Sequence, residues 1–221
     1  MNAKKIAAER AVDYIKDGMI VGLGTGSTAY WAIEKIGAKV REGLNIKAVA
    51  TSLRSEEQAR KLGIKLIPFS EIDKIDITID GADEVDQDLN LIKGGGGALL
   101  REKIVAAASR QLIIVVDESK MVDKLGAFPL PVEMVKFGYE ITVRKLQSLG
   151  CEPVLRKVDN DTYITDNGNF IVDCHFKRID NPSELHNKIN MIPGVVDNGL
   201  FINMAAKVII GYNNGDIKEL I

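Results

Sequence analysis

The sequence has 221 residues, of which 46% are apolar and 27% are charged. This composition is typical of a globular protein and argues against disorder, a collagen-like chain and a coiled coil. The 29 Lys and Arg residues nearly balance the 31 Asp and Glu residues, which leaves a formal net charge of −2. A chain so close to neutral lacks the basic surface with which proteins bind nucleic acid or anionic membranes.

The cysteines and the apolar runs indicate the compartment. Two cysteines, Cys151 and Cys174, are too few for a disulfide framework or a metal cage. No apolar run reaches the roughly 20 residues of a membrane-spanning helix, and the charges within residues 1–18 argue against a secretory signal. We therefore expect reduced thiols and a cytoplasmic protein, with His175 and His186 as structural or exposed side chains rather than metal ligands.

The first part of the chain alternates between helical and extended patterns. The periodicity predicts helices over residues 3–16, 27–41, 52–62 and 97–110, and short strands over residues 19–23, 46–50, 73–80 and 111–116. Strands that alternate with helices predict βαβ crossovers and a parallel sheet that is covered on both faces.

The pattern changes after residues 129–131. From there the sequence predicts a strand, a helix over 139–149, strands over 152–157 and 169–176, a helix over 182–190 and a strand over 195–202. Turn residues at 159–161 and 166–169 indicate a hairpin. This order resembles a small split-βαβ α+β unit, and we expect the last apolar run, residues 207–211, to return to the first sheet.

A glycine loop, Gly24-Thr25-Gly26-Ser27-Thr28, joins the first strand to the next helix. Glycines let a backbone approach a ligand closely, and free N–H groups at a helix N-terminus favour a phosphate. The alternative is a plain turn in which Ser27 caps the helix. The loop also matches a loose dinucleotide fingerprint, but no acidic residue ends the second strand to hold a ribose, although Arg54 could favour a 2′-phosphate.

An acidic turn, Asp80-Gly81-Ala82-Asp83-Glu84, follows the third strand. Ligands of open parallel sheets bind at the carboxyl ends of the strands, where this turn and the glycine loop both fall. Two carboxylates there can exchange protons with hydroxyl groups, whereas the alternative is a solvated loop. A calcium loop beginning at Asp86 is a poor interpretation, because Leu91 stands where its glycine is required.

A second glycine run, Lys93-Gly94-Gly95-Gly96-Gly97, opens the fourth helix. A lysine beside successive free N–H groups makes a cradle for an oxyanion. Glu102 stands in the first turns of that helix, where an acid is either catalytic or an ordinary solvated residue. Lys120, after the next strand, is either a surface lysine or a cation that points into the cleft.

Taken in order, these motifs resemble those of ribose-5-phosphate isomerase, type A, over essentially the whole chain. The segments that carry the resemblance are Gly24–Thr28, Asp80–Glu84, Leu91–Lys103, Val116–Lys120, Phe128–Glu133, Thr165–Asn169 and Ile192–Val196.

The resemblance implies a fold and an activity. It implies a Rossmann-like α/β domain, residues 1–128 plus 204–221, and an inserted α+β, ferredoxin-like domain, residues 129–203, that serves as a lid or in oligomerisation. It further implies a homodimer or homotetramer that interconverts ribose 5-phosphate and ribulose 5-phosphate in the non-oxidative pentose phosphate pathway. The family uses no metal and no organic cofactor, so none is expected here.

The resemblance also implies roles for particular residues. The base that moves a proton between C2 and C1 through an enediolate falls on Glu102, with Lys93 stabilising charge and Asp80 and Asp83 as acid–base groups for ring opening and hydroxyl protons. The residues expected to bind the phosphosugar are Thr25, Gly26, Ser27, Thr28, Asp80, Gly81, Ala82, Asp83, Lys93, Gly94, Gly95, Gly96 and Lys120, together with Lys4.

Three other functions fit parts of the pattern. A sugar-phosphate sensor domain of a transcription regulator shares such a fold, but the residues before Met19 have room for only one helix. An NADP-binding oxidoreductase and a CoA transferase with a glutamate nucleophile are the remaining alternatives.

Overall fold

The computed structural model describes residues 2–221. The chain divides into two compact units: the first comprises the chain up to Ala82, Arg101–Lys120 and Met204–Ile221, and the second comprises Asp83–Leu100 and Met121–Asn203. These boundaries differ from the expected ones, because residues 83–100 and 121–128 belong to the second unit. The reason is local pairing: short strands within residues 83–100 pair with residues 200–201, and Ile92 packs into the same core as Leu200.

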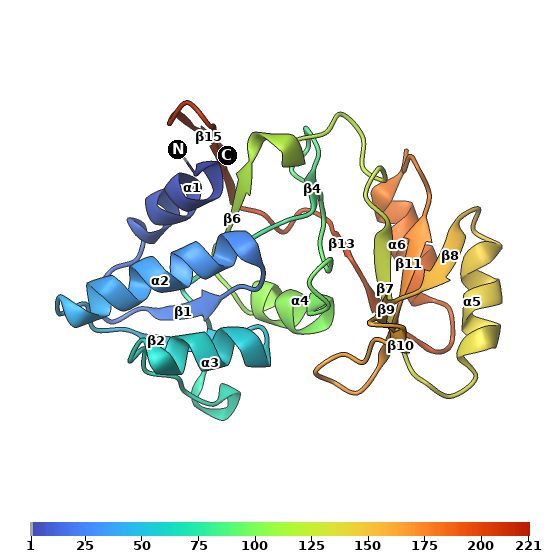
Figure 1. Cartoon of the computed structure of the whole chain (residues 1–221), viewed down its shortest axis with the longest axis horizontal. Helices are drawn as coiled ribbons and strands as arrows, with labels where there is room; N and C mark the ends of the chain where they lie inside the picture. The colour runs from blue at the N-terminus through green and yellow to red at the C-terminus, as the bar shows by residue number, and fades with distance from the viewer. Residues whose placement is uncertain (1) are drawn as a thin grey trace. The chain divides into compact units, whose positions relative to one another are not determined.

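The first unit is built on a six-stranded sheet with the order β15-β14-β6-β3-β1-β2. Figure 1 labels β15, β6, β1 and β2 of this sheet. All neighbours are parallel except β14 and β15. The strands are β1 (Ile20–Leu23), β2 (Lys47–Ala50), β3 (Ile77–Asp80), β6 (Leu112–Asp117), β14 (Lys207–Gly211) and β15 (Ile217–Leu220). The expected parallel sheet is confirmed, and so is the return of residues 207–211 to it.

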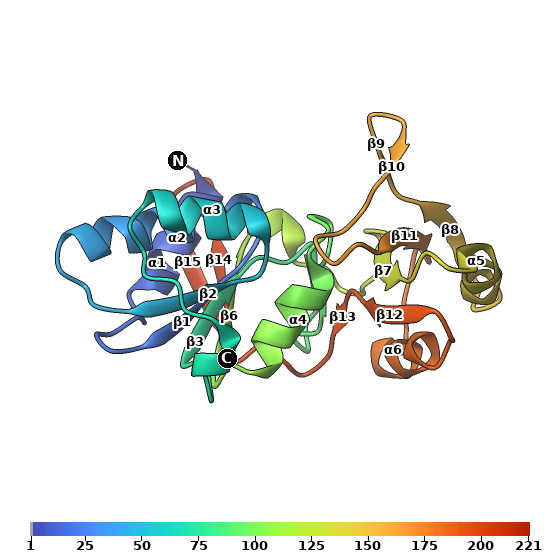
Figure 2. The ribbon, with the colours of Figure 1, turned by 90° about the horizontal axis from the view of Figure 1, so that it is seen from below.

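Helices cover both faces of this sheet. They are α1 (Ala3–Val12), α2 (Ser27–Arg41), α3 (Leu53–Lys61) and α4 (Leu99–Ala107), with the short 3₁₀ turns η1 (Phe69–Glu71) and η2 (Glu118–Lys120). Alternation along β1 sends Val21 and Leu23 into the core beneath α1 and α2, which lie together on one side of the sheet (Figure 2). Gly22 faces the other way, where Val105 of α4 and Thr78 leave no space for a side chain.

The strand order predicts where a ligand binds. The chain runs from β1 out to β2 at one edge and then crosses back to β3 on the other side of β1. In open α/β sheets, ligands bind outside the carboxyl ends of the strands where the order reverses in this way. Here β1 ends at Leu23, directly before the glycine loop, and β3 ends at Asp80.

The second unit is built on an antiparallel sheet with the order β12-β7-β11-β8. Its elements run β7 (Leu130–Met134), α5 (Tyr139–Gln147), β8 (Glu152–Leu155), β11 (Phe170–His175), α6 (Pro182–Asn190) and β12 (Val195–Asn198). This βαββαβ order is the ferredoxin-like arrangement that the sequence predicts. Leu146 of α5 and Ile189 of α6 pack into one core with Val132 and Val172, so both helices cover the same face.

Two smaller pieces complete the second unit. A three-stranded sheet contains β4 (Glu84–Val85), β5 (Leu91–Ile92) and β13 (Leu200–Phe201), and a hairpin contains β9 (Lys157–Val158) and β10 (Asp161–Thr162). The predicted hairpin is confirmed, because β9 and β10 pair antiparallel. Asp159 and Asn160 at its tip have φ values of 50° and 73°, and a two-residue hairpin turn with positive φ at both positions is of type I′.

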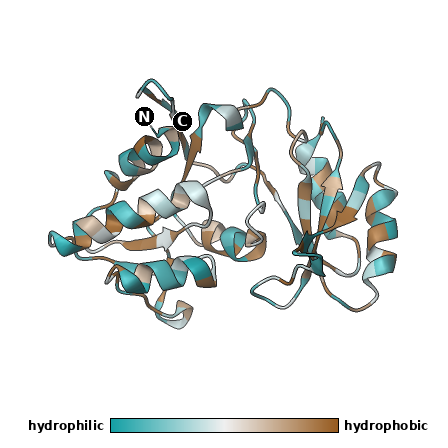
Figure 3. Ribbon diagram, in the orientation of Figure 1, coloured by the Kyte–Doolittle hydropathy of each residue, from teal (hydrophilic) through white to brown (hydrophobic). Residues whose placement is uncertain are grey.

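Hydrophobic residues concentrate in the strands of each unit, and the helices carry hydrophilic residues along one side (Figure 3). Within residues 2–221, no helix combines the length and the apolar character needed to cross a lipid bilayer.

Candidate functional site

The glycine loop leaves the start of α2 open. Gly26 is the N-cap residue, with φ 109° and ψ −179°, a backbone conformation that side chains other than hydrogen strongly disfavour. No side chain among the described residues makes a capping hydrogen bond to this helix. The alternative in which Ser27 caps α2 is therefore wrong, because the helix already begins at Ser27. The first N–H groups of the helix, together with its dipole, suit an anion.

Asp80 fixes the same loop through hydrogen bonds to its backbone. Its side chain is buried, and its Oδ1 accepts hydrogen bonds from the backbone N–H of Thr25 at 3.0 Å and of Gly81 at 2.8 Å. Gly24 has no room for a side chain, because a Cβ there would overlap the Asp80 carboxylate. The loop and the acidic turn are thus fixed to each other at the carboxyl ends of β1 and β3.

A cluster of buried hydroxyl groups supports the loop from the side. The Thr25 hydroxyl lies 2.7 Å from Thr51 Oγ1, 2.8 Å from Ser52 Oγ and 3.2 Å from Ser55 Oγ. Ser55 in turn donates to the Gly24 carbonyl at 2.7 Å. We did not predict these three partners from the sequence; the available signal was that Thr51 and Ser52 directly follow β2, at the same edge of the sheet as the loop.

Two lysines of the first unit stand at the ends of their elements. Lys4 of α1 donates from Nζ to Ser27 Oγ at 3.2 Å and lies 4.0 Å from Asp117 Oδ2, so the structure brings this predicted residue to the glycine loop. Lys120 ends η2, just after β6, with a half-buried side chain.

Glu102 belongs to the first unit as well and lies in the first turn of α4. Its side chain is buried, at 5% exposure, which contradicts the alternative of an ordinary solvated residue. A carboxylate kept from bulk water at the start of a helix is an arrangement that suits a general base.

The second unit contributes Asp83 and the second glycine run. Asp83 Oδ2 accepts a hydrogen bond from the Gly95 N–H at 2.8 Å, and Gly94 has a φ of 103° that favours glycine. Lys93 is buried, with its Nζ 5.4 Å from the centre of the Phe201 ring. The backbone of this run is thereby tied to the acidic turn within one unit.

Glu84, the next residue of the acidic turn, has a structural function. Its buried carboxylate accepts hydrogen bonds from the backbone N–H groups of Gly126 at 2.7 Å and Phe128 at 2.6 Å. It therefore anchors the segment that leads into β7.

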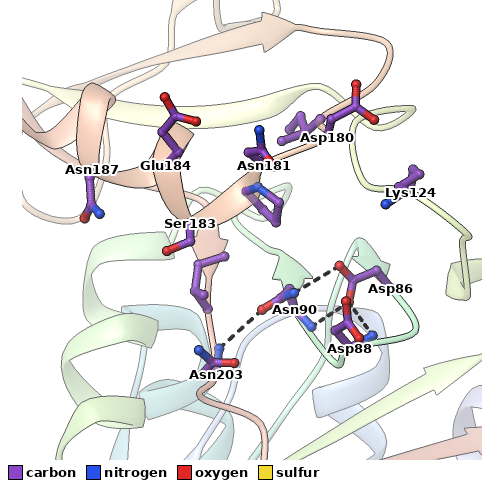
Figure 4. Close-up of a pocket in the computed structure, with 13 residues that line it drawn as sticks. Asp86, Asp88, Asn90, Lys124, Asp180, Asn181, Ser183, Glu184, Asn187 and Asn203 are labelled. Atoms are coloured by element: carbon purple, nitrogen blue, oxygen red, sulfur yellow. Dashed lines mark hydrogen bonds between the residues drawn. The ribbon is translucent and has the colours of Figure 1, made fainter.

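A large polar pocket of about 960 Å³ lies elsewhere in the second unit, between the Asp86–Asn90 turn and the start of α6 (Figure 4). It contains none of the predicted site residues. Asp86 Oδ1 accepts from the N–H groups of Asp88 and Asn90, so the acidic run that begins like a calcium loop closes a turn on itself. Across residues 2–221, no group of three or more His, Cys, Asp or Glu side chains is placed to hold a metal ion.

Known proteins are similar to this chain over its whole length. The family model for ribose 5-phosphate isomerase A (phosphoriboisomerase A) matches residues 47–215. A protein of Bacillus cereus called ribose-5-phosphate isomerase A is 58% identical over 221 residues, which is 100% of both chains. Another of that name, from Streptococcus agalactiae, is 54% identical over 218 residues and 98% of both chains.

Solved structures show the same likeness in three dimensions. The ribose 5-phosphate isomerase A of Methanocaldococcus jannaschii superposes with a TM-score of 0.94 at 43% identity, over 99% of this chain and 98% of the other. The ribose 5-phosphate isomerase of Plasmodium falciparum gives a TM-score of 0.95 at 43% identity, over 99% and 97% of the two chains. The resemblance seen in the sequence motifs is confirmed: the chain belongs to the ribose 5-phosphate isomerase A family.

Proposed function

We propose that the chain interconverts D-ribose 5-phosphate and D-ribulose 5-phosphate, an aldose–ketose isomerisation of the non-oxidative pentose phosphate pathway. The observation that carries the proposal is the full-length match, at 58% identity, to a protein called ribose-5-phosphate isomerase A. A phosphosugar also suits the chemistry of the described residues, which offer an uncapped helix start beside a lysine and buried carboxylates. Family membership favours this reaction over the sensor, oxidoreductase and transferase alternatives.

The phosphate is expected at the glycine loop. The N–H groups of Gly26, Ser27 and Thr28 at the start of α2 would donate to its oxygens, and Lys4 would supply positive charge. A related structure, 42% identical with a TM-score of 0.95, is a complex with phospho-erythronic acid, whose name describes a phosphorylated acid. This supports a site that accepts a phosphate group; Lys120 is proposed as a further contact.

Glu102 is proposed as the base. It removes the proton from C2 of the open-chain aldose and returns it to C1, so that one carboxylate performs both steps through an enediolate. Its burial supports the assignment, because a shielded carboxylate keeps the abstracted proton near the sugar.

The remaining groups are proposed to manage charge and hydroxyl protons. Lys93 and the N–H groups of the second glycine run would stabilise the negative charge that develops on the sugar oxygens. Asp80 and Asp83 would open the furanose ring and move the proton between O1 and O2. The backbone N–H groups that hold these two carboxylates support a fixed orientation for both.

The test is a glutamine substitution at the base. Glu102→Gln keeps the size of the side chain but removes its basicity, so we expect kcat to fall by roughly 10²–10⁴ while KM changes little. Glu42→Gln, an exposed glutamate at the end of α2, is the matched control and should retain the parent activity. Activity of Glu102→Gln within threefold of the parent would remove Glu102 from this role.

An isotope experiment tests the route of the proton. Reaction in D₂O should place deuterium at C1 of ribulose 5-phosphate, at least partially, because a proton held on Glu102 can exchange with solvent. Complete retention of the substrate hydrogen at all temperatures and long reaction times would instead indicate a hydride shift.

We further propose that the chain acts in the cytoplasm as a homodimer or homotetramer, without a metal or an organic cofactor and without nucleic acid or membrane partners. Residues 129–203 are proposed to serve as a lid or in oligomerisation. Light scattering after size-exclusion chromatography of the full chain measures the oligomeric state, and the same measurement in EDTA tests whether a metal is needed for it.

A further inference from the structure

The second glycine run is held by an arginine that the proposed mechanism does not use. Arg156, between β8 and β9, donates from Nη1 to the carbonyl oxygens of Gly94 at 2.8 Å and Gly95 at 3.3 Å. Its Nε donates to Asp173 Oδ2 at 2.9 Å, and its Nη2 donates to Asp173 Oδ1. The guanidinium therefore joins a carboxylate on β11 to two carbonyl groups of the glycine run.

The planarity of the peptide bond gives this contact a consequence. The carbonyl of Gly94 and the N–H of Gly95 belong to one trans peptide and point in opposite directions. With the carbonyl turned to Arg156, the N–H is turned away, and it is this N–H that donates to Asp83 Oδ2 at 2.8 Å. In the same way, the carbonyl of Gly95 turned to Arg156 directs the N–H of Gly96 away from it.

The glycine run is held both from within and from outside. The Gly94 carbonyl also accepts a hydrogen bond from the Gly97 N–H at 3.0 Å, and Arg156 adds a contact from a distant part of the chain. Glycine residues adopt positive and negative φ almost equally well, so the peptide groups of a glycine run reorient easily unless something holds them. The side chains of Arg156 and Asp173 are well shielded, at 13% and 21% exposure, and β11 holds Asp173 between β7 and β8. The carboxylate thus provides a fixed support for the guanidinium.

A second contact comes from the same hairpin. The Tyr163 N–H donates to the Arg156 carbonyl at 2.9 Å, and the Tyr163 ring lies against Gly97, where a Cβ would overlap the phenol. Residues on both sides of the β9–β10 hairpin therefore contact the glycine run, one at each end.

We propose that Arg156 is a positioning residue for the isomerisation. It holds the Gly94 and Gly95 carbonyls so that the Gly95 N–H orients Asp83 and the Gly96 N–H faces the sugar oxygens. This inference rests on the proposed function, because its catalytic consequence requires that Asp83 and the glycine run act on the substrate. Arginine suits the task better than lysine, since its planar fork binds a carboxylate through two nitrogens and still directs Nη1 at the carbonyl groups.

The experiment compares Arg156→Ala and Arg156→Lys with Arg178→Ala. Arg178 is the matched control, because it also pairs with an aspartate of the second unit, Asp180, at 2.7 Å, but both of these side chains are exposed. We expect Arg156→Ala to lower kcat by about 10- to 100-fold, the order of loss for a misplaced catalytic group, with a smaller change in KM. Arg156→Lys should recover little, and millimolar methylguanidinium should partly restore kcat of Arg156→Ala. Arg178→Ala should stay within twofold of the parent.

Hydrogen exchange provides a readout that does not depend on turnover. The peptide that contains Gly95 and Gly96 should exchange faster in Arg156→Ala than in the parent or in Arg178→Ala, while the remaining amides keep their protection. If Arg156→Ala does not fold, Asp173→Asn, which weakens the support but keeps the arginine, should show a milder form of both effects. Unchanged exchange at the glycine run, or a kcat within threefold of the parent in folded Arg156→Ala, would overturn the proposal. Absence of isomerase activity in the parent itself would contradict the proposed function and would leave the exchange result to decide the orienting role of Arg156.

Discussion

Replacing Thr25 by valine tests how the buried hydroxyl cluster supports the glycine loop. Valine has nearly the shape of threonine, so the substitution removes the hydroxyl without opening a cavity. The lost interactions are those of Thr25 Oγ1 with Thr51, Ser52 and Ser55, at 2.7 to 3.2 Å. Thr51 keeps its bond to the Leu23 carbonyl, and Ser52 and Ser55 keep their bond to each other.

The expected loss of stability follows from the number of hydrogen bonds removed. A neutral hydrogen bond contributes about 0.5–1.5 kcal/mol net, and a polar group left without any partner costs more. Because the partners retain other bonds, we expect the free energy of unfolding to fall by about 1–3 kcal/mol. For a chain of this length, Tm falls by roughly 2–4 °C for each kcal/mol. The loop also becomes less rigid, so KM for ribose 5-phosphate should rise by about threefold to tenfold, equivalent to about 0.7–1.4 kcal/mol of binding free energy.

The assay combines urea unfolding with steady-state kinetics, and Thr78→Val is the control. Thr78 is also fully buried and bonds through its hydroxyl to Ser109 at 2.7 Å, but its side chain faces α4 rather than the glycine loop. Thr78→Val should lose stability without a change in KM. If the KM of Thr25→Val rises no more than that of Thr78→Val, the hydroxyl cluster does not shape the binding loop.

Three further predictions concern stability and metals. Glu84→Gln should lower the free energy of unfolding by about 1.5–3 kcal/mol, the contribution of a hydrogen bond to a charged group. The two backbone N–H groups donate to different oxygens of the carboxylate, and the NH₂ group that replaces one of these oxygens cannot accept a hydrogen bond. An unchanged urea midpoint would contradict this. Hydrogen bonds from Lys207 and Tyr14 lower the pKa of Glu219 to about 2 from its ordinary 4.5, so this carboxylate stabilises the fold above pH 4.5 and loses that effect as the pH falls towards 2. The Tm difference between the parent and Glu219→Gln should therefore be a few degrees at pH 7 and shrink steadily in acid, whereas a pH-independent difference would refute the assignment. Overnight EDTA treatment should leave isomerase activity intact, and a loss that zinc or magnesium restores would show that a metal takes part.

Local patterns predicted the regular elements well. The helix over residues 27–41 has those bounds in the structure, because a glycine loop marks its start and its apolar residues recur at helical spacing. The stretch over 73–80 forms a strand only at Ile77–Asp80, since the residues before it make a single bridge, between Ile75 and Ser109. The short strands β4, β5 and β13 were not predicted as a sheet, because two-residue strands leave no periodicity to detect.

In the candidate site, too, local features could be predicted from the sequence and long-range contacts could not. Glycine runs and acidic turns are visible in sequence because their backbone and charge requirements are local, and the structure indeed ties Asp80 and Asp83 to them. The residues that hold these turns in place are distant along the chain. Arg156 lies 62 positions from Gly94, and no spacing rule could connect the two. The alternative in which Ser27 caps the helix arose because serine is common at that position, whereas here the cap is Gly26, whose backbone angles favour glycine.

The position of β14 in the sheet determines when the first unit can finish folding during synthesis. Residues 207–211 form a strand between β6 and β15, yet they leave the ribosome after all the residues of the second unit. Until then, β6 presents an unpaired edge, which invites pairing with other chains. The second unit ends at Asn203, so it is fully synthesised before the last two strands of the first unit. Completion of the first sheet thus requires contacts between residues more than 90 positions apart, the kind of long-range pairing that slows folding. A nascent chain stalled before residue 204 would expose β6 and should aggregate or depend on chaperones.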